Sequence, residues 1–221
     1  MSSRPTKTGA FIAAVLLYGL TGAVGITEAQ TIAVPTGDGR PVMTDGLFHP
    51  EEWADAASHP LGETVELYLK EFRGHVYVGV HCGELDKPFS MDLYLAGSDG
   101  EIRQLHTSAQ IGERALTPGE EDPPWIWGYS PDWYANEVRW NQPMAHSLME
   151  EGETRTEAQR AALFDYDGFE FQILRDKFSG NEWLLRVEVR SYPDFDSPLI
   201  HPEGTPRDRA DGWMRLVFNG G

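Results

Sequence analysis

The strongest constraint on the fold is a two-residue alternation of apolar and polar side chains, which returns in short segments along the chain. Such a period places one row of apolar side chains on a single face of a β-strand. The segments that carry it are 64–72, 76–82, 91–95, 101–107, 169–173, 185–190 and 213–218. Because every such strand must bury its apolar face, we expect an all-β fold, a two-sheet antiparallel β-sandwich.

Short helices are expected at the periphery of this sandwich. Pro50 suits a first helical position and is followed by two glutamates that suit a helix N-terminus, so the sequence predicts a helix over 50–57. Good helix formers predict another over 153–164, with Thr154 or Thr156 as its N-cap. Long helical patterns between the strands are missing, which disfavours a parallel βαβ architecture.

The N-terminal segment has the pattern of a secretory signal peptide. Arg4 and Lys7 precede a small, apolar run over 10–24, and Thr27 and Ala29 offer the small residues that a signal peptidase recognises. The run is shorter than the roughly 20 apolar residues of a membrane span, so we expect cleavage rather than an uncleaved anchor, and no stable membrane insertion afterwards. The expected organisation of this secreted or periplasmic protein is 1–29 signal peptide, 30–44 N-terminal extension and 45–221 β-sandwich domain.

The charge of the chain argues against one class of partner. The formal net charge is −17 at pH 7, and clustered Lys and Arg side chains of the kind that bind a phosphate backbone are missing. We therefore expect no nucleic acid partner. The single cysteine, Cys82, cannot form an internal disulfide, and its place in an apolar alternation predicts a buried, inert thiol.

Four short segments match the pattern of a known family. In chain order they are 45–56 (DGLFHPEEWADA), 74–80 (GHVYVGV), 91–95 (MDLYL) and 183–189 (WLLRVEV). Together they resemble family 9 carbohydrate-binding modules and related DOMON-like domains. The resemblance implies an immunoglobulin-like β-sandwich that binds carbohydrate, often as an appendage to a secreted glycoside hydrolase. Within the first segment, Asp45-Gly46 suits a turn and Trp53 is large enough to plug one end of a sandwich, so we expect structural roles there.

The candidate binding site lies in the proline-rich segment 117–142, which has no clear period and a high density of aromatic residues. Sugar rings present apolar C–H faces and a rim of hydroxyls, so flat aromatic rings beside carboxylate and amide groups suit them. The residues expected to contact the ligand are Trp125, Trp127, Tyr129, Trp133, Trp140, Asp132 and Asn136. The alternative is that these rings cap the open end of the sandwich.

Catalytic signatures are missing from the sequence. It has no Gly-x-Ser-x-Gly elbow, no His-Glu-x-x-His helix and no phosphate-binding Gly loop. Paired carboxylates of a glycosidase are defined by their separation in space and stay open. The prediction is therefore a non-catalytic carbohydrate-binding domain, a candidate accessory to a glycoside hydrolase, with no catalytic residue assigned.

Other functions stay open beside this one. Members of the wider superfamily bind haem in redox proteins, and a haem-binding subunit of DOMON type would need an axial pair, for which Met91 and His106 are the candidates. A protein-interaction module would instead cover the aromatic cluster with a protein partner. A structural calcium ion fits an acidic, exported chain, with weak candidate sites at 165–167 and 194–196; no cofactor is predicted, and no residue is assigned to a metal.

Overall fold

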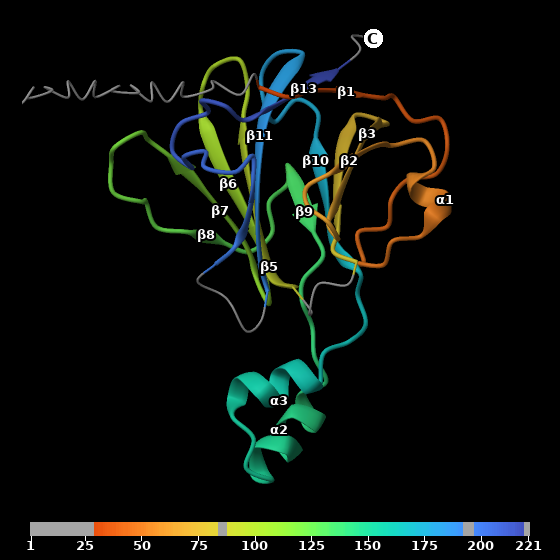
Figure 1. Ribbon diagram of the computed structural model, residues 1–221, viewed down its shortest axis with the longest axis vertical. Helices are drawn as coiled ribbons and strands as arrows, with labels where there is room; N and C mark the ends of the chain where they lie inside the picture. The colour runs from red at the N-terminus through yellow and green to blue at the C-terminus, as the bar shows by residue number, and fades with distance from the viewer. Residues whose placement is uncertain (1–28, 84–87, 192–196, 219–221) are drawn as a thin grey trace, which may run out of the picture.

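The computed structural model describes residues 29–83, 88–191 and 197–218, so nearly all of the expected signal peptide lies outside the described residues. It is an all-β sandwich of two sheets, with a helical hairpin that projects from one end (Figure 1). The fold class expected from the alternation is thus confirmed.

The larger sheet has eight strands in the order β1-β13-β11-β5-β6-β7-β8, with β12 also paired to β11. Their bounds are β1 Thr31–Val34, β5 Pro88–Ala96, β6 Ile102–Thr107, β7 Ile111–Leu116, β8 Ile126–Trp127, β11 Glu182–Ser191, β12 Leu199–His201 and β13 Met214–Phe218. β1 runs parallel to β13, and the other named pairs of this sheet are antiparallel. β1 is therefore an edge strand of this sheet, and β13 lies next to it.

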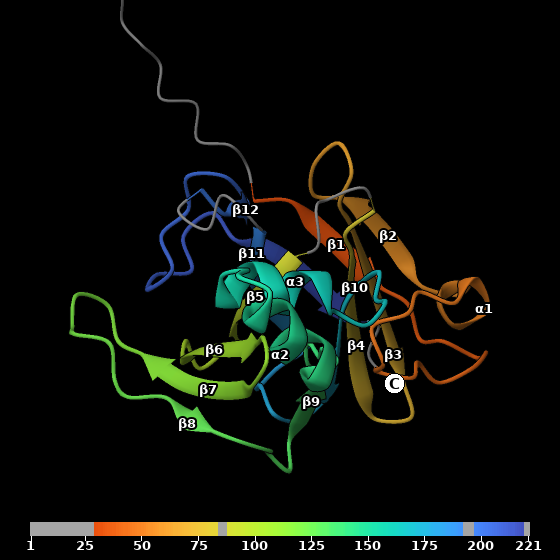
Figure 2. The ribbon, with the colours of Figure 1, turned by 90° about the horizontal axis from the view of Figure 1, so that it is seen from below.

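The smaller sheet has five strands in the order β2-β3-β4-β10-β9, all paired antiparallel. Their bounds are β2 Ala57–Pro60, β3 Glu66–Phe72, β4 His75–His81, β9 Trp133–Ala135 and β10 Gly168–Leu174. The two sheets face each other across the sandwich, as the view from below shows (Figure 2).

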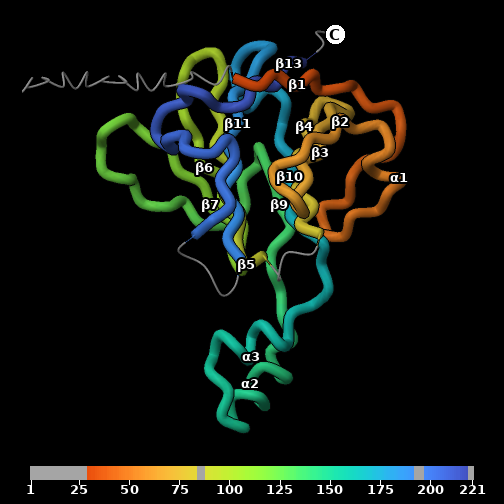
Figure 3. The backbone as a smooth tube through the Cα atoms, viewed as in Figure 1, coloured from red at the N-terminus to blue at the C-terminus, as the bar shows by residue number. Residues whose placement is uncertain are grey.

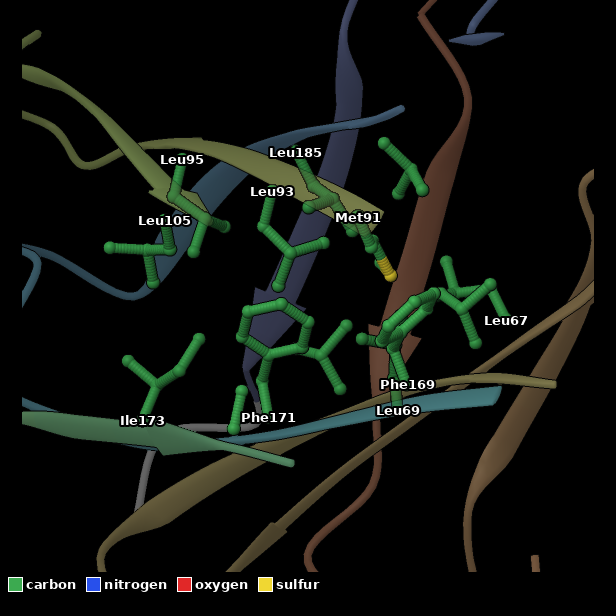
Figure 4. Packing of buried hydrophobic residues seen from close by; sticks show 14 of the residues in the cluster. Leu67, Leu69, Met91, Leu93, Leu95, Leu105, Phe169, Phe171, Ile173 and Leu185 are labelled. Carbon is green, nitrogen blue, oxygen red and sulfur yellow. The ribbon is translucent and has the colours of Figure 1, made fainter. Parts of the chain in front are cut away.

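The core lies between the inner faces of the two sheets. Aliphatic and aromatic side chains from both sheets interdigitate there and are fully buried (Figure 4). They include Leu67, Leu69, Met91, Leu93, Leu95, Leu105, Phe169, Phe171, Ile173 and Leu185. Cys82 is part of this cluster, as expected for a buried residue, and burial raises the pKa of its thiol to about 12.

The expected strands are confirmed, but the two sheets also contain strands that were not expected, namely β1, β2, β7, β8, β9 and β12. The segment 30–44, expected as an extension, begins with β1, which pairs residue for residue with β13 and buries Val34 in the core. The larger sheet therefore includes a strand from before Asp45. β7 was not predicted, because Gly112 and Arg114 occupy its outward positions and leave only a weak alternation.

The helices are shorter and differently distributed than expected. α1, Pro50–Trp53, ends early because the chain enters β2 at Ala57. α3, Arg155–Ala161, lies within the expected 153–164 and begins with a capping box of Thr154 and Glu157. α2, Gln142–Glu150, was not predicted; it packs against α3 to form the projecting hairpin (Figure 3).

Candidate functional site

The seven residues expected to contact a ligand do not form one site. The chain passes from β8 at the edge of the larger sheet to β9 at the edge of the smaller one, which separates the residues on either side of 128–132. Trp125 and Trp127 lie on the larger sheet, whereas Trp133 belongs to the smaller. The other four residues are dispersed over the smaller sheet, its edge and the start of the helical hairpin.

Trp133 and Asn136 are structural residues. Trp133 is 3% exposed, stacks on Phe171 with ring centroids 6.0 Å apart, and donates its indole N–H to Glu113. Asn136, also 3% exposed, accepts the backbone N–H of Glu170 at 2.7 Å and donates to a backbone carbonyl of the same strand. Both side chains are buried by packing and by hydrogen bonds within the protein, so neither is accessible to a ligand.

Three further candidates are dispersed. Trp140 is half-buried and packs against the small apolar core of the α2–α3 hairpin. Asp132 lies 3.5 Å from the Lys177 ammonium group, as an ion pair at the sheet edge. Tyr129 is 74% exposed and stacks on Tyr134, with ring centroids 6.0 Å apart. Among the interactions of the described residues, none joins any of these three side chains to Trp125 or Trp127.

Trp125 and Trp127 form what we call the aromatic platform, on the outer face of the larger sheet. Trp127 lies directly opposite Gly112, where a Cβ atom would come within 2.7 Å of the indole ring. The missing side chain lets this ring lie against the backbone of β7. Trp125 stacks beside it at 5.3 Å with an interplanar angle of 30°, and Trp127 remains 52% exposed. The Trp127 ring thus contacts both Gly112 and Trp125 while the residue stays about half exposed to solvent.

Polar groups surround the aromatic platform. The Arg114 guanidinium lies 4.4 Å from the ring centre of Trp125, and it pairs with the Asp122 carboxylate at 2.9 Å. Asp122 also accepts a hydrogen bond from Arg207 at 2.8 Å, and its side chain remains one-third exposed, at 33%. The His106 ring lies 5.2 Å from that of Trp125 and meets Trp127 edge-on. Ionic and aromatic groups therefore share this surface.

A buried hydrogen-bond network under the platform fixes Arg114. Its Nε donates to Gln104 at 2.8 Å, and the Gln104 amide donates in turn to the Tyr94 hydroxyl at 3.0 Å. Tyr94 is 1% exposed, and burial raises the pKa of its hydroxyl, so it stays a neutral donor. A second arginine, Arg186, lies over the Tyr94 ring and pairs with Glu188 at 3.1 Å. These bonds limit the movement of the groups at the platform.

The motif that carries the family resemblance has a structural role on the smaller sheet. Two backbone N–H groups, of Asp45 and Gly46, and the indole N–H of Trp53 donate to the buried Glu170 carboxylate, at 3.1, 2.9 and 3.2 Å. Burial raises the pKa of Glu170 to about 8, against these bonds, which lower it. Glu170 was not predicted from the sequence, although a glutamate between two phenylalanines in an expected strand was a visible signal. Trp53 covers the outer face of this sheet, over Gly79, rather than plugging an end of the sandwich.

The candidate haem ligands do not converge. Met91 and His106 lie on adjacent strands, but Met91 is opposite Thr107 and His106 is opposite Asp92, so their side chains point to opposite faces of the sheet. Met91 is fully buried in the core and His106 is on the outer face beside Trp125. This pair cannot ligate a single iron.

The calcium candidates have no support in the described residues. At 165–167, the Asp167 carboxylate accepts the backbone N–H of Phe48 at 3.1 Å. The second candidate, 194–196, lies outside the described residues. Over 29–83, 88–191 and 197–218, no group of three or more His, Cys, Asp or Glu side chains is arranged to hold a metal ion. The same ranges contain no helix with the length and apolar composition needed to cross a membrane.

Comparisons with known proteins add no family to this description. A scan against protein-family models, a search of curated proteins and a search of solved structures each find no significant match. The likeness to family 9 carbohydrate-binding modules and DOMON-like domains therefore stays a prediction from the four sequence segments. Function has to be argued from the site itself.

Proposed function

We propose that this is an exported protein that binds carbohydrate through the aromatic platform of Trp125 and Trp127. The observation that carries the proposal is the exposure of Trp127, 52%, although its ring contacts Gly112 and stacks with Trp125. A ring positioned before the ligand arrives loses little conformational entropy on binding. Large aromatic side chains exposed together on a surface are typical of binding sites.

The chemistry of the platform suits a saccharide. The apolar C–H face of a pyranose can stack on the open Trp127 ring, while its hydroxyls need both donors and acceptors at the rim. Asp122 supplies an accessible carboxylate, and the Arg207 guanidinium paired with it, 47% exposed, supplies nitrogen donors beside it. Two of the seven residues named from the sequence, Trp125 and Trp127, keep their proposed role.

Calorimetric titration with soluble oligosaccharides tests the proposal. A panel of glucan, xylan, mannan and chitin fragments is titrated into the purified protein and into Trp127→Ala. We expect at least one saccharide to bind, and Trp127→Ala to weaken it by tenfold or more, about 1.4 kcal/mol. Trp140→Ala is the matched control, since Trp140 packs against the hairpin; it should leave the affinity unchanged.

A negative result has a defined meaning. If the folded protein binds no saccharide in the panel, the platform is not a carbohydrate site. A concentration-dependent oligomer that Trp127→Ala abolishes would then indicate a protein-interaction surface. The Ile126 and Trp127 side chains, 65% and 52% exposed, would be the first residues to test at that interface.

A further inference from the structure

Three polar side chains beside the aromatic platform form a continuous hydrogen-bonded chain. Asp92 of β5 and His106 of β6 lie directly opposite each other in the sheet, and Ser108 follows two residues later on the same face. His106 Nδ1 is 2.9 Å from Asp92 Oδ1, and His106 Nε2 is 3.0 Å from Ser108 Oγ. The order is therefore carboxylate, imidazole, hydroxyl.

The protonation pattern follows from what each group can donate. An ionised carboxylate only accepts, so the ring hydrogen belongs on Nδ1 and points at Asp92. Nε2 then presents its lone pair to Ser108, whose hydroxyl donates to it. This is the tautomer in which a histidine acts as general base towards a serine, with the aspartate fixing its orientation.

The surroundings of Ser108 also suit a nucleophile. Its Oγ lies 3.2 Å from the Gln110 carbonyl, a longer contact than the 3.0 Å to His106, so the imidazole is the closer acceptor. The Gln110 backbone N–H donates to the same Oγ at 3.3 Å, which favours the hydroxyl oxygen as it gains negative charge. Ala109 follows Ser108 directly, and none of the hydrogen bonds among the described residues uses its N–H; an oxyanion donor often stands at this position.

The three hydrogen-bonded side chains differ in burial as a catalytic site requires, with the aspartate and histidine shielded and the serine accessible. The Asp92 and His106 side chains are 8% and 16% exposed, so the base and its orienting carboxylate are shielded from water. Ser108 is half-buried in the turn between β6 and β7, at the surface. The platform rings lie against the same histidine, with centroids 5.2 and 5.8 Å away. A molecule bound on the platform would therefore lie beside the serine.

We propose that Ser108 is the nucleophile of an ester-hydrolysing site, with His106 as general base and Asp92 as the residue that positions it. Its substrate class is an acyl ester of a sugar hydroxyl, a choice of alcohol that rests on the proposed carbohydrate binding. This activity differs from the non-catalytic role expected from sequence motifs, because those motifs describe other folds and a hydrogen-bonded triad is defined by geometry.

The reaction balances with water as the second substrate. Ser108 Oγ bonds to the acyl carbon while its proton passes to His106 Nε2. The bond between the acyl carbon and the alcohol oxygen breaks, and Nε2 returns the proton to that oxygen. Water then attacks the acyl-serine ester, gives one proton through Nε2 to Ser108 Oγ, and leaves the acyl group as a carboxylic acid.

The test combines turnover with covalent labelling. Purified protein is assayed with p-nitrophenyl acetate and with acetylated xylo-oligosaccharides, and is treated with a fluorophosphonate that reacts with activated serines. We expect hydrolysis of both esters, reduced at least 100-fold by Ser108→Ala, and a fluorophosphonate adduct located on Ser108 by peptide mass analysis. Asp92→Asn should lower the turnover number far more than it changes KM, because Asp92 positions the base.

Ser98→Ala is the matched control, since the Ser98 hydroxyl bonds to Ser179 in the turn between β5 and β6, away from the triad; it should keep full activity. Labelling of the wild-type protein does not depend on any variant folding. An intact, folded protein that is neither labelled on Ser108 nor faster than Ser108→Ala would overturn the inference. Hydrolysis of p-nitrophenyl acetate without saccharide binding would uphold the triad and remove only the sugar alcohol, whereas saccharide binding without hydrolysis would leave the proposed function intact.

Discussion

On each sheet of the sandwich a tryptophan ring packs closely against a glycine, but the two tryptophans differ in exposure. On the smaller sheet, Trp53 lies over Gly79 and is 5% exposed. On the larger sheet, Trp127 lies over Gly112 and is 52% exposed. The local device is the same, a missing Cβ that admits a ring, but one ring is covered and the other is open.

The difference comes from what lies above each ring. Around Trp53, the segment that carries α1 covers the smaller sheet, with Val42, Phe48 and Tyr77 packed about the indole and Glu170 holding its N–H. The outer face of the larger sheet has its own buried apolar cluster around Trp213, but none of the apolar clusters of the described residues includes Trp127. A tryptophan–glycine pair alone thus says nothing about ligand binding; the covering segment decides.

The largest expected effect is on the covered face, at Glu170. Glu170→Ala removes the common acceptor of three N–H groups and leaves a cavity, so we expect a loss of about 4 kcal/mol in the free energy of unfolding. Urea denaturation followed by tryptophan fluorescence measures it. The matched control is Glu151→Ala at the exposed end of α2, for which a change above about 0.5 kcal/mol is not expected. A loss below about 1 kcal/mol for Glu170→Ala would contradict this view, because the segment that covers Trp53 would then not depend on the Glu170 side chain.

The next effect is a pH dependence of stability. Burial raises the pKa of Glu170 to about 8 in the folded protein, above its ordinary value, so the folded state binds more protons between those two values. The free energy of unfolding should therefore fall as pH rises from about 5 to 8, by on the order of 3 kcal/mol from this group.

Two histidines act in the opposite direction within part of this window. Burial lowers the pKa of His59 and of His201, so their contribution to stability grows as pH rises towards the ordinary histidine value. The contribution of Glu170 is isolated by comparing wild-type protein with Glu170→Gln in denaturation series at each pH. Parallel curves for the two proteins would contradict the raised pKa.

The smallest expected effects are the losses of stability in Gly79→Ala and Gly112→Ala. In Gly79→Ala, the new Cβ meets a buried Trp53 ring at 2.6 Å, and we expect a loss of about 2 kcal/mol. In Gly112→Ala, the Cβ meets Trp127 at 2.7 Å, but this ring is 52% exposed and a small outward shift costs it little buried contact, so the loss should stay below about 1 kcal/mol. Thermal or urea unfolding of both variants checks the order. Equal losses would mean that the two rings are held alike.

The sheet architecture could be predicted because it depends on a local signal. The alternation in 64–72 or 185–190 decides which side chains face the core, and the core of β3 and β11 follows it. β7 was missed because Gly112 and Arg114 break the outward pattern, although both serve the face above the sheet. The apolar–polar alternation thus fails to reveal a strand whose outward residues take part in contacts on the outer face of the sheet.

The candidate site was predicted only in part, because its members depend on register and on which sheet each strand joins. Trp127 and Trp133 are six residues apart, and nothing local indicates that the chain changes sheets between them. The pairing of Asp92 with His106 likewise follows from the register of β5 and β6. Composition located the aromatic segment, whereas the selection of Trp125 and Trp127 within it required the three-dimensional arrangement.

We propose that the exposed Trp127, and not the covered Trp53, contacts the ligand. The most direct test follows the tryptophan fluorescence of the purified protein during titration with the oligosaccharide panel. It compares the wild-type, Trp127→Ala and Trp140→Ala proteins. We predict a saturable change in the wild-type and Trp140→Ala proteins that is lost in Trp127→Ala. A saturable change that persists at equal affinity in Trp127→Ala, or no change with any saccharide in the folded wild-type protein, would contradict the account.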